Sequence, residues 1–204
     1  EFGLTRALQL NEQLGGTVTA VTVGDASVEP TLRKALAIGA HDAVRVDALP
    51  SDPLQVAREL ASVVSEGAYE LVICGQESID YNGGIVPSAL AEILGWPVVT
   101  PCIGFDPAGG RAKASREIDG GKEVLDIALP AVLGAKKGLV EESELRIPNM
   151  RGIMAARTKP LVVKAPTGAT AGSAPVSFSK PAGKSAVQMI DAQNLDLLVK
   201  KLHE

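Results

Sequence analysis

The chain of 204 residues is long enough for one or two domains with a sizeable core, and its formal net charge is −4. Hydrophobic residues make up 46% but aromatic residues only 3%, so the apolar mass is aliphatic. This acidic, aromatic-poor balance argues against binding of a nucleic acid. Two cysteines and two well-separated histidines also argue against a metal site or a histidine-based triad.

The first half alternates helical and strand-like segments. Leucines at near-helical spacing predict a helix over Leu4–Leu14, ended by Gly15 and Gly16. Strands are expected at 17–23, 43–46 and 71–74, and helices at 29–38, 53–64 and 85–94. The helix at 53–64 is expected to bury a stripe of Leu54, Ala57, Leu60, Ala61 and Val64. The order predicts an α/β fold with a doubly wound, mainly parallel sheet, and we expect another strand to precede the Leu4–Leu14 helix.

The pattern changes after Trp96-Pro97. Segments 111–118 and 122–129 flank Asp119-Gly120-Gly121, which predicts a β-hairpin. A strand at 129–133, an irregular segment at 141–148, a short helix at 150–157 and a strand at 161–164 complete a domain over 1–164. Residues 165–184 favour a flexible linker. A terminal helix is expected at 191–202, and its apolar stripe either docks on a partner or folds back on the same chain. Residues 165–204 thus form the second part of the chain.

The stretch from Gly75 to Val86 runs from the end of a strand into a helix. In open α/β sheets, ligands bind at the carboxyl ends of strands, and the free N–H groups of a helix start attract anions. This predicts a nucleotide site; the plain alternative is a glycine-rich connection in which Asp80 or Asn82 caps the helix. The end of the first predicted strand, at Val23 to Asp25, is a second candidate wall, where Gly24 allows close approach; the alternative is an ordinary turn. The candidate site residues are Val23, Gly24, Gly75, Gln76, Ser78, Asp80, Tyr81, Asn82, Gly83, Gly84, Ile85 and Val86.

The hairpin carries Arg116, Glu117 and Asp119 close together, which by itself is typical of a solvated face. However, the run Ala114 to Leu125 (ASREIDGGKEVL), followed by Pro130 to Leu133 (PAVL), resembles the signature of electron transfer flavoprotein beta subunits. That signature normally closes with Thr, Ala, Cys or Ser, where this chain has Gly134. Residues 35–40, the 75–84 loop with Trp96-Pro97, and Ile147-Pro148-Asn149 are also similar to this family.

The resemblance implies an adenine nucleotide alpha hydrolase-like fold and an electron carrier rather than an enzyme. In that family the beta subunit pairs with an alpha subunit that holds the redox FAD. Electrons pass from acyl-CoA dehydrogenases to a quinone-linked acceptor, without direct membrane insertion. The beta subunit itself binds a structural AMP, or a second FAD in electron-bifurcating types, and the run Asp80-Tyr81-Asn82 favours AMP. A stand-alone adenine-nucleotide-binding protein is the alternative outside this family.

Two further roles are implied by the resemblance. Arg116 and Glu117 match a flavin-proximal interface, where the acid pairs with an alpha-subunit arginine. Arg146, Ile147, Pro148 and Asn149 match the loop that recognises partner dehydrogenases, with Ile147 as its apolar anchor and Arg146 and Arg151 steering an acidic partner. The reduced cysteines fit a bacterial cytoplasm or a mitochondrial matrix.

Overall fold

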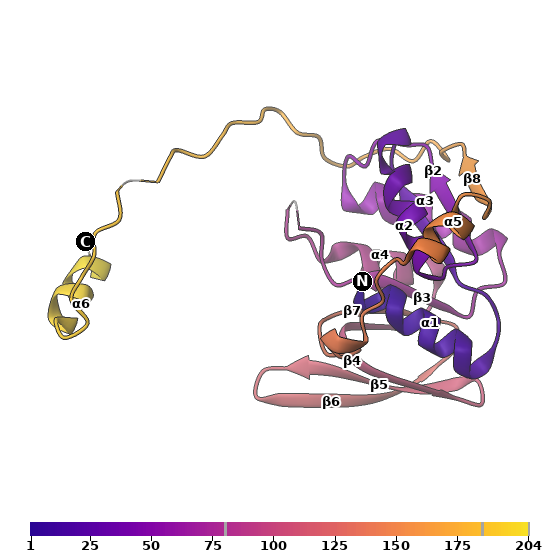
Figure 1. Cartoon of the computed structure of the whole chain (residues 1–204), viewed down its shortest axis with the longest axis horizontal. Coiled ribbons are helices and arrows are strands. Elements are labelled where there is room, and N and C mark those ends of the chain that lie inside the picture. The colour runs from indigo at the N-terminus through magenta and orange to yellow at the C-terminus, as the bar shows by residue number, and fades with distance from the viewer. Residues whose placement is uncertain (80, 185, 204) are drawn as a thin grey trace. The chain divides into compact units, whose positions relative to one another are not determined.

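The computed structural model describes residues 1–79, 81–184 and 186–203. The chain separates into one unit over 1–174 and a second over 175–204. The first unit contains helices α1 (Phe2–Leu14), α2 (Glu29–Ile38), α3 (Pro53–Glu66), α4 (Ile85–Leu94) and α5 (Met150–Ala156) (Figure 1). Its strands are β1 (Thr19–Val23), β2 (Asp42–Val46), β3 (Leu71–Gly75), β4 (Val98–Ala108), β5 (Arg111–Ile118), β6 (Gly121–Ala128), β7 (Ala131–Ala135) and β8 (Leu161–Lys164).

The strands of the described residues lie in two sheets. One is parallel throughout, in the order β1-β2-β8, and the other is mixed, in the order β3-β7-β4-β5-β6. Strands β3, β7 and β4 run parallel, whereas β4, β5 and β6 are antiparallel. The predicted α/β class with mainly parallel strands is therefore confirmed, and the predicted hairpin turns over Asp119 and Gly120, between paired residues Ile118 and Gly121.

The sequence reading missed β4 and misplaced β7. β4 contains Pro101, Gly104 and Pro107, residues that normally argue against a central strand. Its pairing shifts register between Val99 and Cys102, so that Pro101 lies at an irregularity. The strand predicted at 129–133 is instead Ala131–Ala135, because Pro130 precedes the ladder rather than opening it.

Helix α3 packs against both sheets through small and branched side chains. Ala57 and Ala61 contact the cluster around Leu90 and Val132, whereas Val63 packs with Val23 and Val46. Leu54, expected on the buried stripe, is 40% exposed. Glu59 is fully buried instead, which hydrophobic periodicity cannot predict.

Glu59 is buried because it holds the segment that follows β8. Its carboxylate accepts hydrogen bonds from the Thr167 amide and hydroxyl, each at 2.8 Å, and from the Ala169 amide at 3.4 Å. Asp52, which caps α3, also accepts from the amides of Gly172 and Ser173. We call residues 167–173 the strap. The predicted linker therefore begins with a segment tied to α3.

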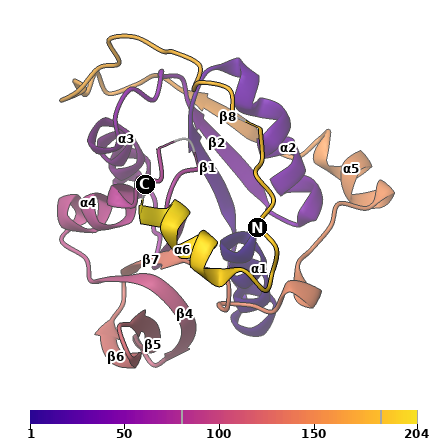
Figure 2. The same ribbon diagram turned by 90° about the vertical axis from the view of Figure 1, so that its left-hand side faces the viewer.

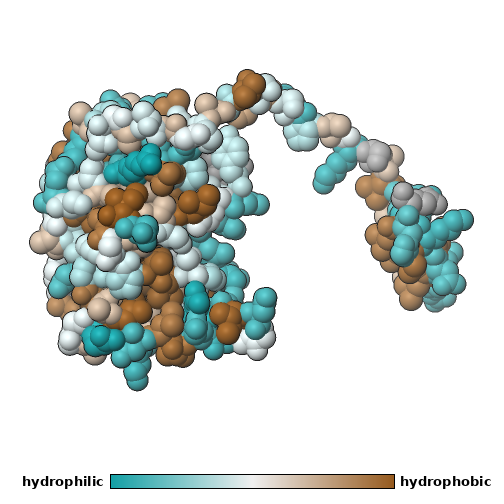
Figure 3. Space-filling view, turned by 180° about the vertical axis from the view of Figure 1, so that it is seen from behind, coloured by the Kyte–Doolittle hydropathy of each residue, from teal (hydrophilic) through white to brown (hydrophobic). Residues whose placement is uncertain are grey.

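The second unit carries α6 (Leu195–His203), which begins four residues after the predicted start at Asp191. Its Leu195, Leu198, Val199 and Leu202 are all exposed. Figure 3 shows apolar atoms gathered along one side of this helix and hydrophilic atoms along the other.

Candidate functional site

The loop after β3 is open to solvent. The Gln76 amide donates to the Ala135 carbonyl at 3.0 Å, and the Ser78 amide donates to the Gly83 carbonyl at 3.0 Å, closing a small turn. Ile79 is 97% and Tyr81 is 72% exposed at its tip. Asp80, a predicted site residue, lies outside the described residues.

The start of α4 is suited to an anion. Gly84 occupies the N-cap position of α4 and has no side chain to bond the first-turn amides, and the alternative of a cap from Asp80 falls on a residue outside the described ones. Asn82 adopts a left-handed conformation, with φ of 51°. A Cβ added at Gly83 would touch the Ser78 hydroxyl at 3.6 Å, and one at Gly84 would touch the Gln76 carbonyl oxygen at 3.4 Å. Gly84 and Ile85 are exposed, and the N–H groups of a helix start attract anions.

The second predicted wall of the site lies at Val23 and Gly24, and its glycine is in closer contact with the rest of the chain. Val23 is buried, and a Cβ added at Gly24 would lie 2.9 Å from the Val28 side chain. A side chain at Gly24 would therefore crowd Val28, so packing within the chain accounts for this glycine. Gly24 directly follows β1 of the parallel sheet, whereas Gly75 ends β3 of the mixed sheet.

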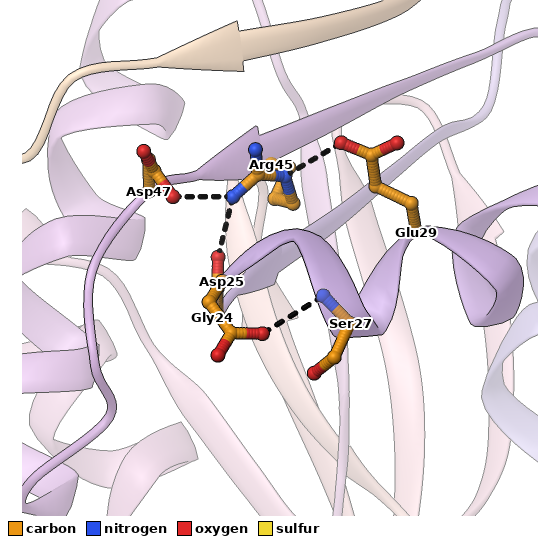
Figure 4. A network of polar contacts seen from close by, with 6 residues as sticks. All are labelled: Gly24, Asp25, Ser27, Glu29, Arg45 and Asp47. Atoms are coloured by element: carbon orange, nitrogen blue, oxygen red, sulfur yellow. Dashed lines mark hydrogen bonds and ion pairs between the residues drawn. The ribbon is translucent and has the colours of Figure 1, made fainter.

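A buried arginine holds the end of β1 in place. Arg45 donates to the Gly24 carbonyl at 2.9 Å and pairs with Asp47 at 2.5 Å and Glu29 at 3.1 Å (Figure 4). The hydrogen bond from Arg45 to Asp47 is the main cause that raises the pKa of the arginine. Hydrogen bonds from Ser27, first from its side chain and then from its amide, lower the pKa of the Asp25 carboxyl. Sequence reading missed Arg45, because a lone cation inside a β-branched strand resembles a solvated residue.

Neither cysteine is an activated nucleophile. Burial raises the pKa of the Cys74 thiol to about 11, so that it stays protonated at neutral pH. Burial also raises the pKa of Cys102, whose thiol donates to the Gly104 carbonyl.

The hairpin acids and bases are paired within the chain. Arg116 faces Glu123 across the β5–β6 ladder at 2.5 Å, and Glu117 forms an ion pair with Lys136. Glu117 and Lys136 line a cavity of about 520 Å³, together with Lys137 and Glu142. Glu117 is about half exposed, so it remains accessible from outside the chain.

The predicted recognition loop combines anchored and exposed residues. Arg146 pairs with Glu12 of α1 at 2.6 Å, and this hydrogen bond raises the pKa of Arg146 and lowers that of Glu12. Asn149 caps α5 by accepting from the Gly152 amide at 2.8 Å. Ile147 is 83% exposed. Arg146 and Asn149 thus support the loop, and Ile147 presents the apolar side chain.

One arginine and one lysine, Arg33 and Lys159, fasten α5 and the residues after it to α2. Arg33 of α2 donates to the carbonyls of Ala156 and Lys159, at 2.7 and 2.9 Å. Lys159 in turn donates to the carbonyls of Leu36 and Ala40, at 2.9 and 2.6 Å. We call this arrangement the reciprocal clamp. Figure 2 shows α5 beside α2. These partners are more than 110 residues apart in sequence, so the spacing of residues gives no signal for them.

Comparisons with known proteins agree with this architecture. The electron transfer flavoprotein domain model matches residues 1–168. The electron transfer flavoprotein subunit beta of Bacillus subtilis is 36% identical over 165 residues, covering 79% of this chain and 63% of the relative. Its counterpart in Syntrophomonas wolfei is 32% identical over 188 residues, covering 91% of this chain and 73% of the relative. The human protein of the same name is 36% identical over 172 residues, covering 81% of this chain and 66% of the relative.

The chain belongs to the electron transfer flavoprotein beta-subunit family. It spans about two thirds of the length of these relatives, from 63% to 73% in the bacterial pair. The α4 loop, the hairpin and the recognition loop all lie within the residues that the electron transfer flavoprotein model matches. No helix in the described part of this family member is long and apolar enough to cross a membrane.

Proposed function

We propose that this chain is the beta subunit of a heterodimeric electron transfer flavoprotein. It carries electrons from acyl-CoA and related dehydrogenases to a quinone-linked acceptor, as an electron carrier rather than an enzyme. The observation that carries this proposal is the family match over 1–168, which includes both the open α4 start and the Glu117 hairpin. A bacterial cytoplasm or a mitochondrial matrix is the proposed compartment.

The α4 start supports a bound AMP in this subunit. Its N-cap residue Gly84 offers no side chain to the first-turn amides, and Gly84 and Ile85 are exposed, so these residues fit a phosphate. Ser78 and Asn82 are exposed polar side chains on the same loop and supply further hydrogen bonds. The nucleotide serves structure by ordering this loop, while the redox FAD belongs to the alpha subunit.

Glu117 supports contact with the alpha subunit near its flavin. Its carboxylate is half exposed and already has a cationic partner, Lys136, on the neighbouring segment. An arginine from the alpha subunit would share this acid, and a partly buried network of this kind favours one domain orientation. Lys136 therefore positions the acid before the subunits meet.

The second unit supports the heterodimer in another way. The exposed apolar stripe of α6 includes Leu198 and Val199, and a short amphipathic helix of this kind gains stability by packing on another surface. The alpha subunit is the proposed surface.

Cofactor analysis tests the proposal. The complete subunit is co-expressed with its alpha subunit, purified and heated to release nucleotides. We expect a yellow complex, reducible by an acyl-CoA dehydrogenase, with one FAD and one AMP. Two FAD and no AMP would indicate the bifurcating type with NADH as donor. A colourless monomer that binds ATP would instead indicate a stand-alone nucleotide-binding protein and would refute the proposal.

The partner loop is tested with a single substitution. Ile147→Ala removes an apolar side chain that is 83% exposed in this subunit. We expect electron acceptance from the dehydrogenase to fall at least about tenfold, as for a typical hot spot, while the heterodimer and its FAD content stay unchanged. Leu49→Ala, which removes another exposed aliphatic side chain, is the control. Normal transfer rates in the Ile147 variant would refute its anchor role.

A further inference from the structure

A cavity of about 570 Å³ opens between α2 and residues 146–159, which comprise the recognition loop and α5 and which we call the recognition segment. The cavity lies next to the Ile147 loop. Its apolar lining comes from Pro30 and Ala37 on one side and from Pro148 and Ile153 on the other. Lys34 and Arg157 add a cation on each side. The cavity therefore combines an apolar interior with positive charge, and we call it the α2–α5 pocket.

The two cations are available to an outside ligand. Lys34 and Arg157 are exposed, and neither takes part in an ion pair recorded among residues 1–79, 81–184 and 186–203. Arg33, which also lines the pocket, is committed to the carbonyls of Ala156 and Lys159. Arg33 thus stabilises the walls of the pocket, whereas Lys34 and Arg157 are available to contact a partner.

The pocket is held open by tight packing at its base. Gly152 of α5 lies so close to α2 that an added Cβ would be 2.2 Å from the Ala37 carbonyl oxygen. The reciprocal clamp fastens the same two segments. Because its walls are fixed in the isolated subunit, a partner that fills the pocket pays little to order it.

We propose that the α2–α5 pocket receives an apolar side chain of the partner dehydrogenase that is flanked by carboxylates. This inference rests on the proposed function and adds a second contact to the Ile147 loop. Pro148 lines the pocket and directly follows Ile147, so one surface of the partner reaches both. Ile147 then inserts into the dehydrogenase, and the dehydrogenase inserts into this pocket. Lys34 and Arg157 select an acidic partner and accelerate the encounter.

Reversal of the two charges tests the pocket. The complete heterodimer carrying Lys34→Glu and Arg157→Glu is compared with wild type for binding to a purified acyl-CoA dehydrogenase, over a series of salt concentrations. We expect the Kd to rise at least about tenfold at low salt, and the salt dependence of binding to become weaker. FAD content and electron delivery to the acceptor should stay unchanged, because neither residue lies in the cofactor machinery.

Two reference variants make the outcomes distinct. Lys113→Glu reverses an exposed charge on β5 and should bind like wild type. Ile147→Ala reports on the proposed function itself. If Ile147→Ala weakens binding but the double reversal does not, the pocket proposal is overturned and the proposed function stands. If the wild-type heterodimer binds no acyl-CoA dehydrogenase, both are overturned together.

Discussion

The α4 loop and the recognition segment are both exposed, yet they are built in opposite ways. In the α4 loop, the N-cap residue Gly84 has no side chain to bond the backbone donors of the helix start, and Ile79 and Tyr81 project into solvent. In the recognition segment, side chains bond both ends of α5: Asn149 caps its start, and Arg33 donates to the Ala156 carbonyl at its end. The first arrangement suits a ligand that completes the structure, and the second suits a rigid surface that presents side chains to a protein.

The strongest test of this contrast removes the space at the α4 start. Gly84→Asp places a side chain and a negative charge beside the amides proposed to hold the phosphate. We expect AMP in the purified heterodimer to fall from one equivalent to nearly none, measured by chromatography of the released nucleotides. Gly121→Asp adds the same charge in open space on the hairpin and should keep its AMP. Unchanged AMP in the Gly84 variant would place the phosphate elsewhere.

The recognition segment should instead respond to crowding at its base. Gly152→Val drives a branched side chain into the Ala37 carbonyl, so α5 must shift away from α2. Overpacking of this kind typically costs about 1–3 kcal/mol in the free energy of unfolding, which urea denaturation measures. AMP content should not change. Ala155→Val introduces the same residue on an exposed part of α5 and should cost only its smaller helix propensity, about 0.5 kcal/mol. Equal effects in the two variants would contradict the close α2–α5 contact.

The strap offers a third effect, which is confined to one segment. Glu59→Ala leaves the Thr167 and Ala169 amides without their buried acceptor, at a cost of about 1–3 kcal/mol unless the strap moves into solvent. We expect hydrogen exchange to accelerate in the peptide 165–174, with Glu59→Gln intermediate because it keeps one acceptor oxygen. Glu66→Ala on the same helix is the control, since its partner Lys164 precedes the strap. Unchanged protection of the strap would show that Glu59 does not hold it.

The smallest expected effect is a pH dependence at the start of α3. Hydrogen bonds from the backbone amides of Gln55, Ser173 and Gly172 hold the pKa of Asp52 below its ordinary value of 3.8. Because the folded-state pKa is the lower one, Asp52 contributes stability above pH 3.8, and the contribution is lost as pH falls toward the folded value. The Tm difference between wild type and Asp52→Asn should therefore be present at pH 6 and shrink toward pH 3. A constant difference would contradict this.

Local patterns determined much of the fold. The predicted bounds of α2, α4 and β8 are those of the structure, because Pro30, Gly39 and Gly95 mark helix ends by their own backbone preferences. Strand β4 was missed because local backbone preferences argue against a strand there. Its prolines disfavour a strand, and only pairing with β7 and β5 holds the segment in this conformation.

The candidate site divides in the same way. The α4 loop was predicted from its glycines and its place between a strand and a helix, whereas the hairpin acids and the Ile147 loop were predicted through the resemblance to the family signature. Only the tertiary structure decided the roles of Arg45, Glu59, Arg33 and Lys159, whose partners are mostly distant in sequence. The tertiary structure also showed that Gly24 packs closely against the Val28 side chain. A buried charge is stable only beside its partners, and those partners are brought together by the fold.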